Sequence, residues 1–311
     1  MLIDKVENTY GNQKISDFDD GKDPLFPDNI NCINSKSSDG YSFDYQNPNI
    51  LDIDEDEIEF KSLEDVFGKF AFEDEIHSEK TEQGQLGDCY FIETLQSFSQ
   101  FGKIIINRIR RIKEKLYEII FIIDGIETKV IITDTMPFMK NTNILYFSTP
   151  IEIKEVYYLC LFEKAFAKIC GGYSNIVGGG GAEIKKSLVG YKSEIESLKD
   201  DINMIEIKNK IKKAKLDGNC LIGLSMNPSY KSGHALTLVD LNEKNIIIKD
   251  PHGKSFKKYE SIFEQFSFDE DKKKEIRKRF EDNGLLELPV ETLKKKMIYH
   301  YENNYNNYEV F

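Results

Sequence analysis

The spacing of apolar positions predicts two helices in the first part of the chain. In the stretch after Cys89, the side chains of Phe91, Leu95 and Phe98 recur every three or four residues and so form one stripe along a helix. The segment Glu155–Cys170 carries apolar residues on several sides of a helical projection, a pattern typical of a buried helix. Both predicted helices are long enough to build a core.

Strand patterns occur on both sides of these helices. Leu116–Ile123 and Ile126–Thr133 flank Asp124-Gly125, a residue pair typical of a two-residue turn, and together they predict a β-hairpin. Further along, the patterns predict three strands, over residues 220–226, 235–240 and 246–249. They also predict two charged helices, over residues 195–215 and 270–280. Helices lead the first part and strands the second, which indicates an α+β fold.

Four consecutive glycines, Gly178–Gly181, hold no regular structure without outside help, and we interpret them as the seam between two lobes. The predicted organisation is an acidic, partly loop-like extension over residues 1–75, a first lobe over 76–180 and a second lobe over 181–311. The length of 311 residues and the 40% apolar content allow a core of that size.

Composition then restricts the class of protein. No apolar run approaches the roughly 18 residues that a membrane helix needs, and the N-terminus lacks the pattern of a standard secretion signal. Five scattered cysteines without a CxxC pair argue against a disulfide framework or a zinc knuckle. We therefore expect no membrane span and a location in the reducing cytoplasm.

The negative charge is concentrated at the N-terminus. Residues 1–80 hold 21 acidic and 7 basic side chains, whereas the rest of the chain is close to neutral. This balance makes nucleic acid a poor candidate partner. Residues 11–50 have the composition of loop or partly disordered chain, and the acidic run from Asp52 to Glu59 lacks the glycine that an EF-hand needs, because Glu57 occupies its place.

Candidate chemistry begins at Cys89. This cysteine follows a glycine-punctuated loop and starts the first predicted helix, where unpaired N–H groups and the helix dipole favour a thiolate. Gln83, six residues earlier, offers an amide N–H that could help to stabilise an oxyanion. A cysteine at a helix start is more often a small apolar residue, so this segment needs a partner to indicate catalysis.

The partner is predicted from a second hairpin. If the strands 235–240 and 246–249 pair about a turn centred on Asn242, His234 and Asp250 stand directly opposite each other on one face. A slip of one residue would put them on opposite faces. A cysteine with a histidine and a carboxylate in this arrangement indicates nucleophilic catalysis.

These residues resemble the calpain-type cysteine proteases. The segment from Gln83 to Phe91, QGQLGDCYF, is similar to the family signature QGxLGDCWF, and LFEKAFAKICGGY from Leu161 is similar to its LLEKAYAKxxGxY helix. Three shorter blocks also match, namely DxxP from Asp134, GHA from Gly233 and DPHG from Asp250, where the family has DxxP, GHA and NPWG. The similarity spans roughly residues 80–300.

The resemblance implies a papain-like, two-lobed core with a helical lobe and a β-rich lobe. It implies that Cys89 is the nucleophile, His234 the general base, Asp250 the orienting residue and Gln83 an oxyanion donor. The implied activity is that of an intracellular endopeptidase acting on protein or peptide substrates. This chemistry requires no cofactor. Calcium is the one ion that the resemblance suggests.

Several positions depart from the family pattern. Asp250 stands where the family usually has Asn, His252 replaces a Trp that shields the catalytic residues, and Tyr90 replaces the Trp after the nucleophile. Glu163 matches an acidic position that could serve calcium, but Lys80 lies where an acidic ligand is expected, and the stretch after Gly253 is basic. We therefore expect at most a modest calcium requirement.

Two other interpretations stay open at this point. An acyl transferase of the transglutaminase kind also uses Cys, His and Asp, and Asp250 is compatible with it. A non-cleaving scaffold that binds peptides is the third interpretation, against which the complete set of Cys89, His234 and Asp250 argues.

Overall fold

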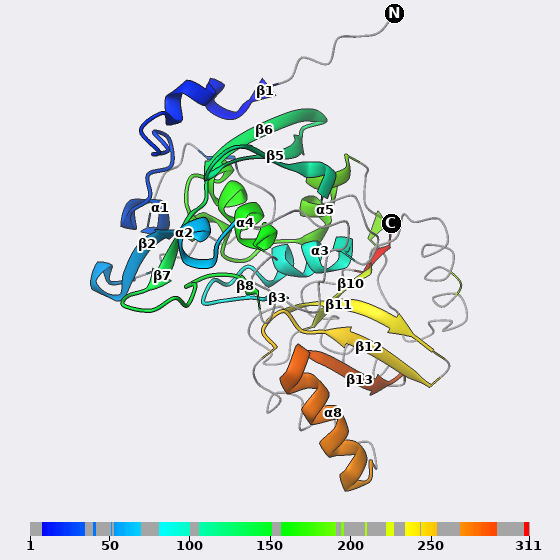
Figure 1. The fold of residues 1–311 in the computed structure, drawn as a ribbon. Helices are drawn as coiled ribbons and strands as arrows, with labels where there is room; N and C mark the ends of the chain where they lie inside the picture. The colour runs from blue at the N-terminus through cyan, green and yellow to red at the C-terminus, as the bar shows by residue number, and fades with distance from the viewer. Residues whose placement is uncertain are drawn as a thin grey trace, which may run out of the picture.

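The computed structural model describes residues 8–34, 40–41, 51, 53–69, 81–99, 106–150, 157–190, 194–195, 209, 222–226, 234–242, 244–253, 268–290 and 308–310. Two larger sheets organise these residues, with helices beside each (Figure 1). The predicted helix over 195–215 lies outside the described residues except for Asn209 and for Ile195, which belongs to a short strand. The basic stretch after Gly253 lies outside them as well.

The first sheet has the order β1-β6-β5-β4, and its strands are Asn8–Thr9, Ile126–Thr133, Leu116–Ile123 and Ile109–Lys113. The predicted hairpin is confirmed, since β5 and β6 pair in antiparallel register from Ile123↔Ile126 onwards. Asp124 and Gly125 both have positive φ values of 51° and 78°, as a tight two-residue turn requires.

The second sheet has the order β13-β12-β11-β10-β14-β9, and its strands are Leu285–Pro289, Asn245–Lys249, His234–Leu241, Ile222–Met226, Tyr308–Val310 and Glu194–Ile195. The described chain also contains two small two-stranded sheets. One pairs β2 (Ile58–Ser62) with β7 (Thr135–Met139), and the other pairs β3 (Thr81–Glu82) with β8 (Thr149–Pro150). The three predicted strands of the C-terminal part are all present, and the mixed fold is confirmed.

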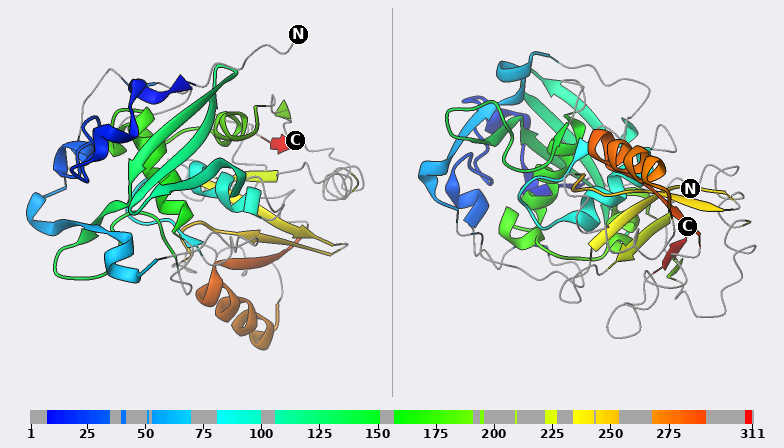
Figure 2. Two further views of the ribbon diagram at one scale, coloured as in Figure 1. Left: turned by 45° about the horizontal axis from the view of Figure 1, so that its top comes forward. Right: turned by 90° about the horizontal axis from the view of Figure 1, so that it is seen from below.

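The helices of the described chain are α1 (Ile30–Asn34), α2 (Leu63–Phe67), α3 (Cys89–Ser99), α4 (Tyr158–Ile169), α5 (Gly181–Val189) and α8 (Glu270–Asn283). Every residue of α4 is buried, which explains its apolar side chains on all sides. The helix α3 stacks Phe91 on Phe166 of α4 at 4.6 Å between ring centroids, and its other side packs on β11. The helix α3 therefore lies between the two sheets (Figures 1 and 2).

The glycine run lies against the helix that starts with Cys89. Gly181 is the first residue of α5, which packs against β5 and α3. A Cβ at Gly179 would lie 2.5 Å from the ring of Tyr90, so only glycine permits this close approach. The run thus brings the chain close to α3, and the chain remains beside the first sheet as far as Val189.

The N-terminal segment is more ordered than its composition suggests. Residues 8–34, here called the N-terminal strap, form short helical turns that pack on the core through Phe18, Phe26 and Ile33, all nearly inaccessible to solvent. Lys168 of α4 meets Asp23 at 2.6 Å, and Lys164 meets Asp28 at 2.6 Å. The described part of the predicted loop over residues 11–50 thus consists mainly of turns and short helical turns, and the charge pairs hold it against the core.

Candidate active site

Cys89 is the first residue of α3 and is partly exposed, whereas the other cysteines of the described chain, Cys32, Cys160 and Cys170, are buried. The helix starts there because the carbonyl of Asp88 accepts the amide protons of Phe91 and Ile92. The preceding loop is tight at Gly84, where a Cβ atom would lie 2.1 Å from the carbonyl oxygen of Phe147. The sequence pattern around Cys89 thus places an accessible thiol at a helix N-terminus.

His234 is the first residue of β11, and the strand passes directly over the thiol. The backbone N–H of Ala235 lies 3.5 Å from the Sγ atom of Cys89, and the imidazole of His234 also hydrogen-bonds with Cys89. On the other side, Nε2 of His234 lies 2.8 Å from Oδ1 of Asp250. The structure therefore brings Cys89, His234 and Asp250 into one connected row.

The hairpin that joins His234 and Asp250 has a different register from the predicted one. Its last described pairs are Leu238↔Ile248 and Thr237↔Lys249, so Asp250 lies beyond the end of β12 and is not directly opposite His234. A bulge between Leu238 and Asp240 inserts one residue into β11. The resulting register differs by two residues from the prediction, and because two is even, the side chains keep the same face.

The electrostatics of the row favour a charged imidazole. Burial lowers the pKa of His234, but its hydrogen bonds with Asp250 and Cys89 outweigh that effect and raise the pKa from 6.5 to about 9. Asp250 is fully buried and also accepts the backbone N–H of His252 at 2.9 Å. A fixed carboxylate behind the imidazole stabilises the positive form of the ring.

Gln83 lies at the end of β3, next to the turn that carries Asp250. Its backbone N–H donates to the carbonyl of Pro251 at 2.8 Å, and its side-chain amide donates to the carbonyl of Leu86. An amide nitrogen carries two protons, so the contact with Leu86 engages one of them. The predicted oxyanion donor is thus in the same loop system as the thiol, with its amide fixed by the loop itself.

Sequence reasoning missed how two departures from the family pattern are accommodated. The ring of His252 stacks on that of His234 at 5.1 Å between centroids and 22° between planes. Tyr90 is buried, and its hydroxyl donates to the carbonyl of Ile176 at 3.0 Å, which ties α3 to the chain just before the glycine run. Both side chains make contacts that a single sequence does not reveal.

Comparison with known proteins identifies the family. The pattern of the calpain family cysteine proteases matches residues 22–283, which is most of the chain. This protein belongs to the calpain family. Its membership supports a cysteine-type peptidase.

Individual calpains match over part of their length. Calpain-8 of Mus musculus is 29% identical over 227 residues, which cover 64% of this chain and 32% of the relative. Calpain-8 of Rattus norvegicus is 29% identical over 180 residues, covering 52% and 25%, and the calpain-type cysteine protease DEK1 of Arabidopsis thaliana is 30% identical over 99 residues, covering 31% and 4%. The chain therefore spans about a third or less of the length of these relatives.

The acidic helix position of this calpain does not provide an open calcium ligand. The carboxylate of Glu163 is buried, accepts the hydroxyl of Ser148 at 2.8 Å and its N–H at 3.3 Å, and lies near the buried carboxyl group of Asp88. Among the residues that the structure describes, no group of three His, Cys, Asp or Glu side chains could hold a metal ion. The described residues thus do not fit calcium at Glu163.

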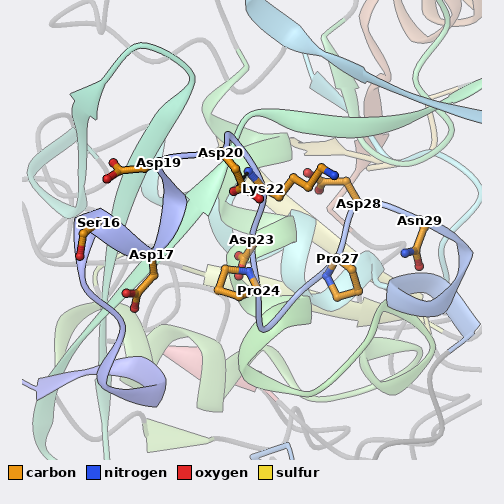
Figure 3. A pocket seen from close by; sticks show the side chains of 10 residues that line it. All are labelled: Ser16, Asp17, Asp19, Asp20, Lys22, Asp23, Pro24, Pro27, Asp28 and Asn29. Atoms are coloured by element: carbon orange, nitrogen blue, oxygen red, sulfur yellow. Dashed lines mark hydrogen bonds between the residues drawn. The ribbon is translucent and has the colours of Figure 1, made fainter.

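One hollow of this calpain lies away from the row of Cys89, His234 and Asp250. It measures about 640 Å³ and belongs entirely to the N-terminal strap (Figure 3), where it is lined by Ser16, Asp17, Asp19, Asp20, Lys22, Asp23, Pro24, Pro27, Asp28 and Asn29. Two of its acids, Asp23 and Asp28, are the partners of Lys168 and Lys164.

Among the described helices, none is long and apolar enough to cross a membrane.

Proposed function

We propose that this protein is an endopeptidase that cleaves protein substrates with Cys89 as nucleophile, His234 as general base and Asp250 as the residue that orients His234. The observation that carries the proposal is the continuous contact from the Cys89 thiol through His234 to the carboxylate of Asp250, whose Oδ1 lies 2.8 Å from Nε2. An accessible thiol and a base held by a third group form the arrangement that nucleophilic catalysis requires.

The reaction follows from this row. His234 takes the proton of the Cys89 thiol, and the imidazolium is stabilised by Asp250, consistent with its pKa of about 9. The thiolate attacks the peptide carbonyl, and the resulting oxyanion is met by the amide of Gln83 and by the N–H groups at the start of α3. His234 then protonates the leaving amine, and water, activated by the same ring, hydrolyses the acyl-enzyme.

The proposal includes a papain-like division into two lobes, with substrate bound between them. The helices α3 and α4 with the first sheet would form one lobe and the second sheet the other, and the row would lie where α3 packs against β11 (Figure 1). The free thiols of the described cysteines are compatible with an intracellular, cytoplasmic enzyme. The acidic N-terminal extension would then include the strap as a packed part of the first lobe.

Cleavage of an unfolded protein substrate tests this proposal. Wild type should degrade the substrate, and Cys89→Ala should not, because a methyl group cannot attack a carbonyl. Cys32→Ala makes the same chemical change in α1, away from the row, and should retain activity. Thermal unfolding of each variant checks that the fold is intact. Activity in Cys89→Ala above a few per cent of wild type would show that another group is the nucleophile.

A further inference from the structure

Gln96 lies where the elements that carry the candidate catalytic groups meet. It belongs to α3, which starts with Cys89, and it lies two helical turns further along that helix. The helix packs against β11, which starts with His234, and against the short strand β3 through the contacts described below. The side chain of Gln96 is only 1% exposed.

Its amide group connects α3 to both strands. The Nε2 atom of Gln96 donates to the carbonyl oxygen and to the hydroxyl of Thr81, at 3.2 Å each. Thr81 is in β3, two residues before Gln83. On the other side, the hydroxyl of Thr237 lies 3.4 Å from Oε1 of Gln96 and 3.2 Å from the carbonyl oxygen of Glu93, so its proton is shared between two acceptors of α3.

All members of this bridge are withdrawn from solvent. Thr81 and Thr237 are fully buried, and Glu93 is 1% exposed. A buried amide or hydroxyl that loses its partner retains the full cost of desolvation, so the hydrogen bonds are strongly preferred over any alternative. Hydrogen bonds are also directional, whereas apolar contacts tolerate sliding. The bridge therefore selects one placement of β3 and β11 relative to α3.

The selected placement is the one that aligns the catalytic groups. Thr237 lies three residues from His234 along a regular strand, and Glu93 lies one helical turn from Cys89. A shift of β11 along α3 would therefore move the imidazole relative to the thiol by a similar amount. Misplacement by about 1 Å can reduce a catalysed rate by roughly a hundredfold.

We propose that Gln96 and Thr237 are positioning residues that hold Cys89, His234 and Gln83 in register. This inference rests on the proposed function, since it assumes that Cys89 and His234 react together. Neither side chain touches the reacting atoms. Their effect is transmitted through α3, β3 and β11.

Substitution of Thr237 by Val tests the inference, because it removes the hydroxyl with little change in shape. The matched control is Thr94→Val, since Thr94 is also fully buried and its hydroxyl, within the described part of the chain, bonds to neither β3 nor β11. That hydroxyl bonds to the carbonyl of Tyr90 at 2.8 Å and, at 3.5 Å each, to Glu93 and to the carbonyl of Gly181 in α5. Thr237→Ser restores the hydroxyl. The readout is the rate at which iodoacetamide alkylates Cys89 as a function of pH, measured by mass spectrometry, together with kcat and KM.

In Thr237→Val we expect the thiolate limb of the alkylation profile to move to higher pH by about one unit, which reduces alkylation below that limb about tenfold. We expect kcat to fall with little change in KM. Thr237→Ser should return both towards wild type, and Thr94→Val should leave both unchanged. Gln96→Leu should move the limb in the same direction, which provides a second test if Thr237→Val folds poorly.

An unchanged limb in folded Thr237→Val and Gln96→Leu would overturn the inference and reduce the bridge to a structural contact. An equal shift in Thr94→Val would also overturn it, because any lost buried hydroxyl would then suffice. If wild-type Cys89 itself reacts as an ordinary thiol, the proposed Cys89–His234 pair fails, and the positioning role fails with it. The wild-type profile therefore distinguishes the two failures.

Discussion

The Nε2 atom of His234 lies 2.8 Å from Oδ1 of Asp250, although the two residues are not cross-strand partners. Continuing the register of Thr237↔Lys249 places Leu236 opposite Asp250 and His252 opposite His234, in agreement with the stacking of the two imidazole rings. The carboxylate reaches the ring diagonally, from the turn after β12. It is held there by the backbone N–H of His252 as well as by His234.

Replacing Asp250 by Asn should move the alkaline limb of the activity profile to lower pH. The buried carboxylate helps to raise the pKa of His234 to about 9, and an amide would keep the hydrogen bond but lose the charge. The imidazolium, and with it the thiolate–imidazolium pair, would then be lost at lower pH. We expect an active enzyme whose kcat/KM declines at lower pH than that of wild type, as measured from pH 5 to about 10.

The control for this experiment is Asp240→Asn, the same change at an exposed position of β11. It should leave the alkaline limb in place. An alkaline limb that does not move in Asp250→Asn would mean that the carboxylate does not act on His234 in solution.

The N-terminal strap should contribute strongly to stability through Lys168. This lysine is almost fully buried against Asp23, and burial lowers its pKa to about 8 despite the opposing effect of that carboxylate. Asp23→Asn would leave a buried ammonium without its counter-ion. We expect the free energy of unfolding to fall by about 3–5 kcal/mol, measured by urea denaturation at pH 7.

Asp20→Asn provides the matched control, since Asp20 is an exposed acid of the same segment and should change stability little. A loss in Asp23→Asn no larger than in Asp20→Asn would show that the strap is not held by this pair. Deleting residues 1–55 should abolish activity, because it removes the strap and exposes the core side chains that the strap covers.

Calcium should have at most a modest effect on activity. The carboxylate of Glu163 is already engaged by Ser148, and the segment after Gly253 is rich in lysine rather than in the carboxylates that calcium prefers. Proteolysis of an unfolded substrate should therefore continue in the presence of a calcium chelator. A chelator that reduces the rate to the level of Cys89→Ala, with recovery when calcium is added back, would contradict this expectation.

The parts of the fold that the sequence predicts well are those encoded by local patterns. The hairpin around Asp124 follows from turn residues between two regular apolar runs, and the helix after Cys89 follows from its stripe and its glycine-rich entry. The candidate site could be assembled because each of its residues stands at the start or end of such an element.

The remaining features depend on contacts between distant residues. The pairing of Lys168 with Asp23 joins positions 145 residues apart, and neither residue is distinguishable from a surface charge in the sequence. The bulge between Leu238 and Asp240 has no local signal, so the predicted register of the second hairpin is wrong. The predicted side-chain face is nevertheless right, since the error is an even number of residues. The polar bridge through Gln96 is likewise visible only in three dimensions.

The most direct test of the proposed activity is labelling by a peptidyl epoxide, an electrophile that needs both a bound peptide chain and an activated thiol. We predict that one equivalent of the reagent modifies Cys89 of the wild-type protein, that proteolysis is lost in proportion, and that His234→Ala slows the modification strongly. Cys32, Cys160 and Cys170 should stay unmodified because they are buried. Full loss of proteolysis with an unmodified Cys89, or full labelling of Cys89 with proteolysis intact, would contradict the assignment of Cys89 as the nucleophile.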